Sequence, residues 1–272
     1  EGAVGGMGPT DISVFFQERF GPSEASVVVV GDVEGSEVES LVRKHFGAWA
    51  GPPASGSEAE THPRFSQRRI IVVDRPGSVQ SEVRIGHVGV PRSTPRYFPL
   101  KVFNAILGGA FTSRLMLRLR EDLGFTYGVR SRLAMRREAG PFTISTAVAT
   151  EVTAAAVGET FIQVDELLEG GARPEEVERA RDYIAGVFPL QLETTGQVAS
   201  RIAETEVYDL PDDFYVTYRD RIRAVTAEDA LDAGRAVVRP SEMIVVVVGD
   251  ASEVQGPLED LDLGPVQVVR DL

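Results

Sequence analysis

The sequence lacks cysteine altogether, and it contains only three histidines and one tryptophan among its 272 residues. The absence of cysteine excludes disulfides, thiolate nucleophiles and cysteine-ligated zinc sites together. No apolar run approaches the roughly 18 residues that a membrane-spanning helix requires, so we expect no membrane span. Basic residues are also few: 28 lysines and arginines stand against 41 acidic residues, which gives a formal net charge of -13. Such a charge repels phosphate backbones and disfavours nucleic acid as a partner.

The remaining composition is typical of a folded globular protein. With 43% hydrophobic and 25% charged residues, a chain of this length can bury one large core or two modest ones. Short β-branched or alternating runs predict strands at 27–30, 69–74, 80–90, 125–135, 142–150 and 243–248. Amphipathic periodicity predicts helices at about 12–20, 38–46, 100–107, 154–168, 174–188, 195–206, 212–223 and 226–238. These patterns predict an α+β fold.

Local signals set several boundaries. Thr10 and Asp11 are candidate caps of the first helix. The segment 50–66 is rich in proline, glycine and serine, which predicts a linker. The segment RREAGP joins two predicted strands and favours a hairpin, and Pro189 should kink or break the helix that begins at Pro174.

One segment of the chain occurs twice. PSEASVVVVGD at 22–32 returns as PSEMIVVVVGD at 240–250, with nine of eleven residues identical and a predicted helix before each copy. A period of about 218 residues makes 55–272 one complete unit, and 1–54 the tail of a preceding unit with the start of a linker. The same period places about 164 further residues of that unit upstream. The alternative is that two strand–turn units converged on similar sequences.

The stretch from Leu100 to Met135 contains the most distinctive pattern. It predicts a helix, a break at Gly108–Gly109, a second helix, a stop at Gly124 and then a strand. Arg120 and Tyr127 lie on either side of that stop. Arginines gather here although the chain is acidic, namely Arg114, Arg118, Arg120, Arg130, Arg132, Arg136 and Arg137. We therefore expect the functional surface in this region.

These segments resemble the pitrilysin-like, or inverted-zincin, zinc peptidases, which include insulysin and mitochondrial processing peptidase. LGGAFTSRLMLRLREDLGFTYGVRS at 107–131 is similar to that family's carboxy-terminal signature. VVVVGDVEGSEVESLVRKHFGAW at 27–49 is similar to the closing segment of its amino-terminal domain. The resemblance implies two related units, each an antiparallel-rich sheet backed by helices, clamped around a chamber that holds a peptide.

The resemblance also implies roles for Arg120 and Tyr127, which match the arginine and tyrosine that the second unit sends toward the substrate. Peptide hydrolysis builds negative charge on the scissile carbonyl oxygen, and a fixed donor aimed there contributes about 3 kcal/mol. Arginine offers a permanently charged planar fork, and tyrosine a neutral hydroxyl on a rigid ring. The local alternative is that Arg120 pairs with Glu121 or Asp122 and that Tyr127 only packs.

The sequence departs from the family in its metal ligands. The family holds zinc with H-x-x-E-H and a distant glutamate in the first unit, whereas His45, His62 and His87 lack that spacing. We therefore expect no metal in this chain, and zinc in the complete enzyme or its catalytic partner. The acidic cluster Glu175, Glu176 and Glu178 favours a solvated helix start over a ligand set. Arg114 and Arg118 favour a solvated face or an acidic partner.

The first functional hypothesis is the metal-free, substrate-binding half of a zinc-dependent endopeptidase, inactive alone. Its zinc would come from an upstream segment, a second copy or a separate subunit, which implies a homo- or heterodimer acting on peptides or unfolded polypeptides. Substrate could add as a strand to an exposed sheet edge. One alternative is a non-catalytic scaffold or assembly protein with the same fold. Another is a generic α/β ligand-binding domain, although no phosphate-cradling glycine loop supports it. The compartment, bacterial cytoplasm or periplasm, stays open.

Overall fold

The structure is a computed structural model that describes residues 2–53 and 65–270. The chain forms two compact units, residues 1–60 with 190–212 and residues 61–189 with 213–272. The predicted boundary at residues 54 and 55, most of the predicted linker and His62 lie outside the described residues. None of the described helices is both long and apolar enough to cross a membrane.

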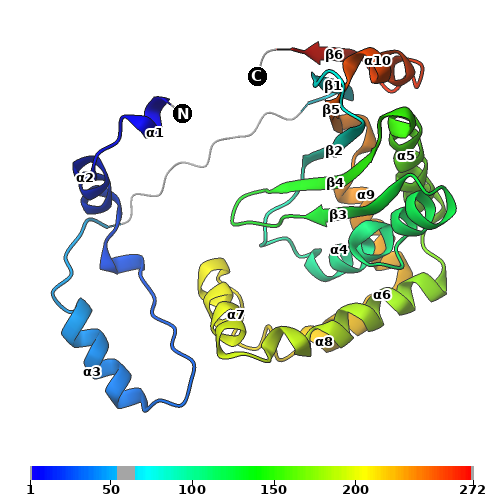
Figure 1. Cartoon of the computed structure of the whole chain (residues 1–272). Coiled ribbons are helices and arrows are strands. Elements are labelled where there is room, and N and C mark those ends of the chain that lie inside the picture. Colours follow the sequence, from blue (N-terminus) through cyan, green and yellow to red (C-terminus); the bar gives the residue numbers. More distant parts are fainter. Residues whose placement is uncertain (1, 54–64, 271–272) are drawn as a thin grey trace. The chain divides into compact units, whose positions relative to one another are not determined.

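A six-stranded sheet forms the centre of the second unit, with the strand order β3-β4-β2-β5-β1-β6 (Figure 1). The strands are β1 (Arg69–Asp74), β2 (Gln80–Val88), β3 (Thr126–Leu133), β4 (Pro141–Ala149), β5 (Ile244–Gly249) and β6 (Val266–Val269). The pairs β2–β4, β2–β5 and β3–β4 are antiparallel, whereas β1–β5 and β1–β6 are parallel. The prediction of an antiparallel-rich sheet in an α+β fold is therefore confirmed.

The helices of this unit pack mainly on one face of the sheet. They are α4 (Tyr97–Asn104), α5 (Thr153–Gly170), α6 (Pro174–Val187), α8 (Tyr218–Ala224), α9 (Ala227–Val237) and α10 (Ala251–Glu259). α5 packs on β2 and β4, and α10 packs on β1. Along β1, β2, β4 and β5 buried residues alternate with less buried ones, and the buried residues include Ile70, Val83, Ile85, Ile144 and Val245. Successive side chains of a strand point to opposite faces, so the buried residues lie on one face of the sheet. The residues of the opposite face stay partly exposed.

Most of the local predictions for this unit are confirmed. The strands β3 and β4 form the expected hairpin, and α6 ends at Val187, just before Pro189 begins a short 3-10 turn, η5 (Pro189–Leu192). The helix predicted at 212–223 is shorter, because residues 212–217 form turns and α8 begins only at Tyr218. Short 3-10 turns also precede α5 and β5, as η4 (Thr150–Val152) and η6 (Pro240–Glu242).

The first unit contains helices but no sheet among its described residues. They are α1 (Gly2–Gly5), α2 (Pro9–Arg19), the 3-10 turn η1 (Pro22–Glu24), α3 (Gly35–Phe46) and α7 (Thr195–Tyr208). The strand predicted at Val27–Val30 is wrong, because a strand needs a neighbour to pair with and none is present in the described part of this unit. The cap prediction is wrong for Thr10, because Gly8 is the N-cap of α2, and right for Asp11, whose carboxylate accepts from the Gly8 N–H at 2.8 Å and completes a capping box.

The sequence repeat has a structural counterpart. α2 and α9 have the same length, and both begin 13 residues before the proline that opens each copy's 3-10 turn. The valine run that follows differs in state: it forms the interior strand β5 in the second copy and belongs to no strand in the first. The same residues therefore form a strand only where neighbouring strands supply hydrogen bonds.

Candidate functional site

A tight reversal of the chain brings Arg120 and Tyr127 together. Arg120 lies on η3 (Met116–Asp122), a segment of π-helical pitch, which is uncommon and recurs at functional sites. Gly124 then adopts a left-handed backbone with φ of 64°, and the Phe125 N–H donates to the Leu119 carbonyl at 2.8 Å. Glycine reaches that φ without steric cost, so the chain turns back into β3 directly after the helix.

The Arg120 guanidinium lies within about 6 Å of two aromatic rings. Its central carbon is 4.8 Å from the ring centre of Phe111 and 5.8 Å from that of Tyr127. The Arg120 Nε is also 3.4 Å from the Glu121 carboxylate, so Arg120 does pair with its neighbour, as the local alternative expects. Tyr127 does not simply pack, because it is 95% exposed. The two side chains predicted from the sequence are thus neighbours, and both reach solvent.

A bulge in β3 determines how Tyr127 projects. The β3–β4 register shifts between Thr126 and Val129, and two threonines bond across the irregular backbone. The Thr126 hydroxyl donates to the Ala147 carbonyl at 2.7 Å and accepts from the Gly128 N–H at 3.0 Å and the Thr146 hydroxyl at 2.9 Å. Bulges of this kind redirect a side chain and are frequent beside active sites. Thr126 therefore positions Tyr127.

An ion pair fixes the segment that leads into η3. The Arg114 guanidinium donates to both Glu176 carboxylate oxygens at 2.8 Å and to the Gly171 carbonyl at 2.8 Å, and both side chains are largely buried. Burial on its own would raise the pKa of Glu176. Hydrogen bonds from Arg114 and from the Arg173 N–H, with the charge of Arg114, lower that pKa to about 2. Glu176 is thus ionised at neutral pH, as the pairing requires.

Two predictions about this region are therefore wrong. Glu176 is not part of a solvated helix start, because its side chain is 7% exposed and paired with Arg114. Arg114 is not on a solvated face, whereas the Arg118 side chain is 40% exposed and donates to Glu159 at 2.9 Å. These partners lie 62 and 41 positions away in the sequence, so spacing along a helix could not identify them. Glu175 is exposed, as predicted.

No metal centre can be assembled from the described residues. They contain no group of three or more histidine, aspartate or glutamate side chains arranged to hold an ion. His45 lies in the last turn of α3, and His87 lies in β2 with its ring hydrogen-bonded to the backbone. α4 continues into η2 (Ala105–Gly109) without a ligating side chain. The described part of the chain therefore does not fit the zinc that the resemblance implies for the complete enzyme.

Sequence reasoning missed Phe111, Thr126 and Thr146 at this site. Phe111 is 60% exposed, which is unusual for phenylalanine, but an exposed aromatic has no signature in a single sequence. The two threonines depend on the β3–β4 register, which forms only on folding. Composition could have identified none of the three.

The family described as "Peptidase M16 inactive domain" matches residues 7–184. The chain belongs to this family. An uncharacterised zinc protease of Streptomyces coelicolor is 27% identical over 256 residues, which cover 90% of this chain and 53% of that protein. A non-peptidase homologue of Helicobacter pylori is 26% identical over 155 residues, covering 55% of this chain and 35% of that protein. The chain thus spans about half the length of the first of these relatives.

The fold also matches a solved member of the peptidase M16 inactive domain family. The crystal structure of such a domain from Pseudomonas fluorescens superposes with a TM-score of 0.80 at 23% identity, covering 90% of this chain and 58% of that one. At this identity the match establishes the fold. The resemblance to the pitrilysin-like zinc peptidases, and specifically to their zinc-free half, is confirmed by the family match.

Proposed function

We propose that this chain is the substrate-binding half of a zinc-dependent endopeptidase and supplies Arg120 and Tyr127 to a zinc site held elsewhere. The geometry of the pair supports the proposal. A half-buried guanidinium beside a fully exposed phenol presents two hydrogen-bond donors to solvent from a helix and an adjoining strand. Donors fixed on scaffold can stabilise the oxyanion that develops on the scissile carbonyl. An arginine and a tyrosine that only packed would not both face outward.

The proposal extends to the organisation of the chain. We propose that residues 1–54 close a preceding unit and that 55–272 form the complete metal-free unit. The support is the recurrence of helix, 3-10 turn and valine run in both parts. The zinc would then be held by an upstream unit of a longer parent chain, by a second copy or by a separate peptidase subunit.

Hydrolysis of a fluorogenic peptide tests the proposal. The assay uses this chain mixed with a separate peptidase subunit that carries H-x-x-E-H, or a longer parent chain that carries such a motif. Arg120→Ala and Tyr127→Phe should each lower kcat, by up to about 100-fold for a lost oxyanion donor. Both should leave thermal unfolding within about 2 °C, because surface substitutions change stability little. Arg137→Ala and Tyr183→Phe are matched controls at an exposed hairpin tip and on α6.

An unchanged kcat in both variants removes the pair from the mechanism. The zinc content of the same assembly, measured with and without the partner, identifies which component holds the metal. Metal that copurifies stoichiometrically with this chain alone would contradict the metal-free assignment.

The second candidate function is a non-catalytic scaffold or assembly role. The observation that favours it is the relative in Helicobacter pylori whose name describes it as a non-peptidase homologue. A scaffold would bind a peptidase-like partner without raising hydrolysis. A complex that is stable in gel filtration, contains no zinc and shows no turnover would support this role over the first.

A further inference from the structure

The face of the sheet that the helices leave partly exposed carries an unusual distribution of side chains. Backbone pairing places Arg130, Ser145 and Arg84 opposite one another on β3, β4 and β2. The next row contains Arg132, Thr143 and Gly86 in the same way. Directly paired residues point to the same face. Small residues on β4 and β2 therefore lie beside long arginines.

On the same face, the rows continue into apolar residues on β5 and β1, the strands beyond β2. β5 adds Val246 next to Arg84 and Ile244 next to Gly86, and β1 adds Ile71 beyond Val246. Gly86, Thr143, Ile244 and Val246 from these rows line a hollow of about 310 Å³. Phe65 also lines it. A hollow of this size and lining suits one large apolar side chain.

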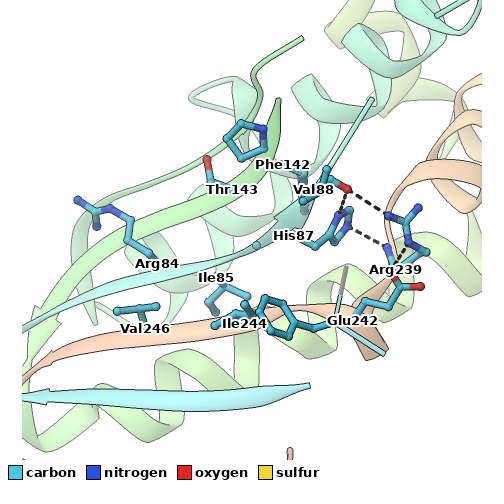
Figure 2. Close-up of a pocket in the computed structure, with 13 residues that line it drawn as sticks. Arg84, Ile85, His87, Val88, Phe142, Thr143, Arg239, Glu242, Ile244 and Val246 are labelled. Carbon is cyan, nitrogen blue, oxygen red and sulfur yellow. Dashed lines mark hydrogen bonds and ion pairs between the residues drawn. The ribbon is translucent and has the colours of Figure 1, made fainter. Parts of the chain in front are cut away.

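Fixed polar groups close one end of the hollow, as Figure 2 shows. The Arg239 backbone N–H donates to the His87 Nε2 at 3.1 Å. The Arg239 guanidinium donates to the Glu242 carboxylate at 2.7 Å and to the Val88 carbonyl at 3.1 Å. Because these groups are hydrogen-bonded to one another, they form a fixed wall at this end of the hollow. Arg84 lies at the other end, where it donates to Glu82 at 2.9 Å.

Two arginines on this face have no such partner. Within the described part of the chain, neither Arg130 nor Arg132 lies within ion-pairing distance of a carboxylate, and both are exposed. This face thus carries unpaired positive charge although the whole chain has a net charge of -13. Local charge of the opposite sign favours an acidic partner and repels basic ones.

The spacing of the arginines fits an extended chain. Arg130 and Arg132 are two residues apart on a strand, about 7 Å, which is also the spacing of alternate side chains of an extended peptide. The hollow extends from Thr143 on β4 to Ile244 on β5, so its middle lies at Gly86, two strands from Arg132 and about 10 Å away, a distance that three residues of a peptide crossing the strands can span. Arg130 is three residues from Tyr127 on the same strand, so the arginines lie close in the chain to the candidate site.

We propose that this face binds a polypeptide segment that follows β3 and then crosses the sheet, and that carries acidic side chains about three residues from one large apolar side chain. The acidic groups pair with Arg130 and Arg132, and the apolar side chain fills the hollow. The inference rests on the proposed function, since it defines the class of substrate that would lie beside Arg120 and Tyr127.

Fluorescence polarisation with the full 272-residue chain tests the proposal. The probe is a fluorescein-labelled peptide, Gly-Glu-Gly-Glu-Gly-Gly-Leu-Gly-amide. Replacing both glutamates of the probe by lysine should abolish binding, and replacing its leucine by alanine should weaken binding about tenfold, from the apolar area lost. Arg130→Gln and Arg132→Gln should each weaken it about threefold, the effect of one exposed charge pair. Raising the salt concentration should weaken it further.

Thr143→Trp fills the hollow from a partly exposed position and should weaken binding while leaving the circular dichroism spectrum unchanged. Arg137→Gln makes the same charge change at the hairpin tip and should have no effect. The proposal is overturned if glutamine probes bind as tightly as glutamate probes or if Arg130→Gln binds like wild type. It is also overturned if Arg130→Gln abolishes self-association in sedimentation while the probe does not bind.

The two proposals fail separately. Binding needs no zinc and no hydrolysis, so it is measured on this chain alone. An absent probe signal together with a low kcat for Arg120→Ala would refute the binding face only. Arginine-dependent binding together with an unchanged kcat for Arg120→Ala would refute the role of the pair only.

Discussion

The Arg114 guanidinium and the Glu176 carboxylate meet through two hydrogen bonds of 2.8 Å, joining the segment before η3 to the first turn of α6. The same carboxylate accepts from the Arg173 N–H at 2.8 Å, so it also caps α6. One side chain thus ties a helix start to the segment that carries Arg120. The pair stabilises the candidate site without touching it.

Glu176→Gln should therefore destabilise the fold by about 3 kcal/mol, because it leaves the largely buried charge of Arg114 uncompensated. Urea unfolding measures the change. Glu175→Gln is the matched control, because Glu175 is a neighbouring exposed carboxylate on the same helix turn, and it should change stability by less than about 0.5 kcal/mol. Equal effects of the two substitutions would show that the pair contributes nothing.

The stabilisation from Glu176 should depend on pH in an acid window. Its pKa is about 2 in the folded chain, below the ordinary value of 4.5, so its contribution is complete above pH 4.5 and is lost as pH falls toward 2. The contribution at stake is about 3 kcal/mol. The measurement is the difference in unfolding free energy between wild type and Glu176→Gln from pH 6 to pH 2.5. Asp229 and Asp250, whose pKa values are also lowered by hydrogen bonds, affect both proteins alike and cancel. A constant difference across this range would contradict the prediction.

Much of the fold could be predicted because its signals are local. The strand at 69–74 and the ends of helices at Gly124 and Pro189 each depend on a few adjacent residues. The Val27–Val30 run shows the limit, since it has the same valines as β5 but no strand beside it in the described part of its unit.

The candidate site also contains residues that local sequence could identify and residues that depend on distant contacts. Arg120 and Tyr127 lie close in sequence on either side of a helix stop, so one motif could identify both. The Arg114–Glu176 pair, the bulge at Thr126 and the row from Arg84 to Arg130 depend on contacts between distant residues or on strand register. A single sequence contains no record of register between strands.

Phe111→Ala should lower turnover of the complete enzyme without altering the donors themselves. The Phe111 ring lies 4.8 Å from the Arg120 guanidinium, and a stacked cation at an exposed site gains about 0.5–1 kcal/mol. Loss of that contact should reduce kcat about threefold, with KM little changed. Leu117→Ala is the control, because Leu117 is also an exposed apolar residue and lies on η3. A change in KM alone would instead identify Phe111 as a substrate contact.

Thr126→Val should disturb Tyr127 through the β3 bulge. Valine keeps the shape of threonine but removes the hydroxyl that bonds Ala147, Gly128 and Thr146. We expect kcat to fall as far as it does in Tyr127→Phe, and stability to fall by about 1–2 kcal/mol from the unpaired groups. Thr126→Ser keeps the hydroxyl and should restore both. A Thr126→Val enzyme with normal kcat would show that the bulge does not position the phenol.

Gly108→Ala should destabilise the chain by about 1–3 kcal/mol, although glycine-to-alanine changes within helices are usually favourable. A Cβ at position 108 would come within 2.7 Å of the Ser131 N–H nitrogen and 2.8 Å of its hydroxyl oxygen, so η2 could not approach β3 as closely. Gly186 lies near the end of α6, where an added Cβ would meet no atom within 4 Å, and Gly186→Ala should stabilise by about 0.5–1 kcal/mol. Opposite signs for two chemically identical substitutions follow only if close contact with β3, rather than helix propensity, requires glycine at position 108. Urea unfolding of both variants decides between these causes, because propensity alone would stabilise both.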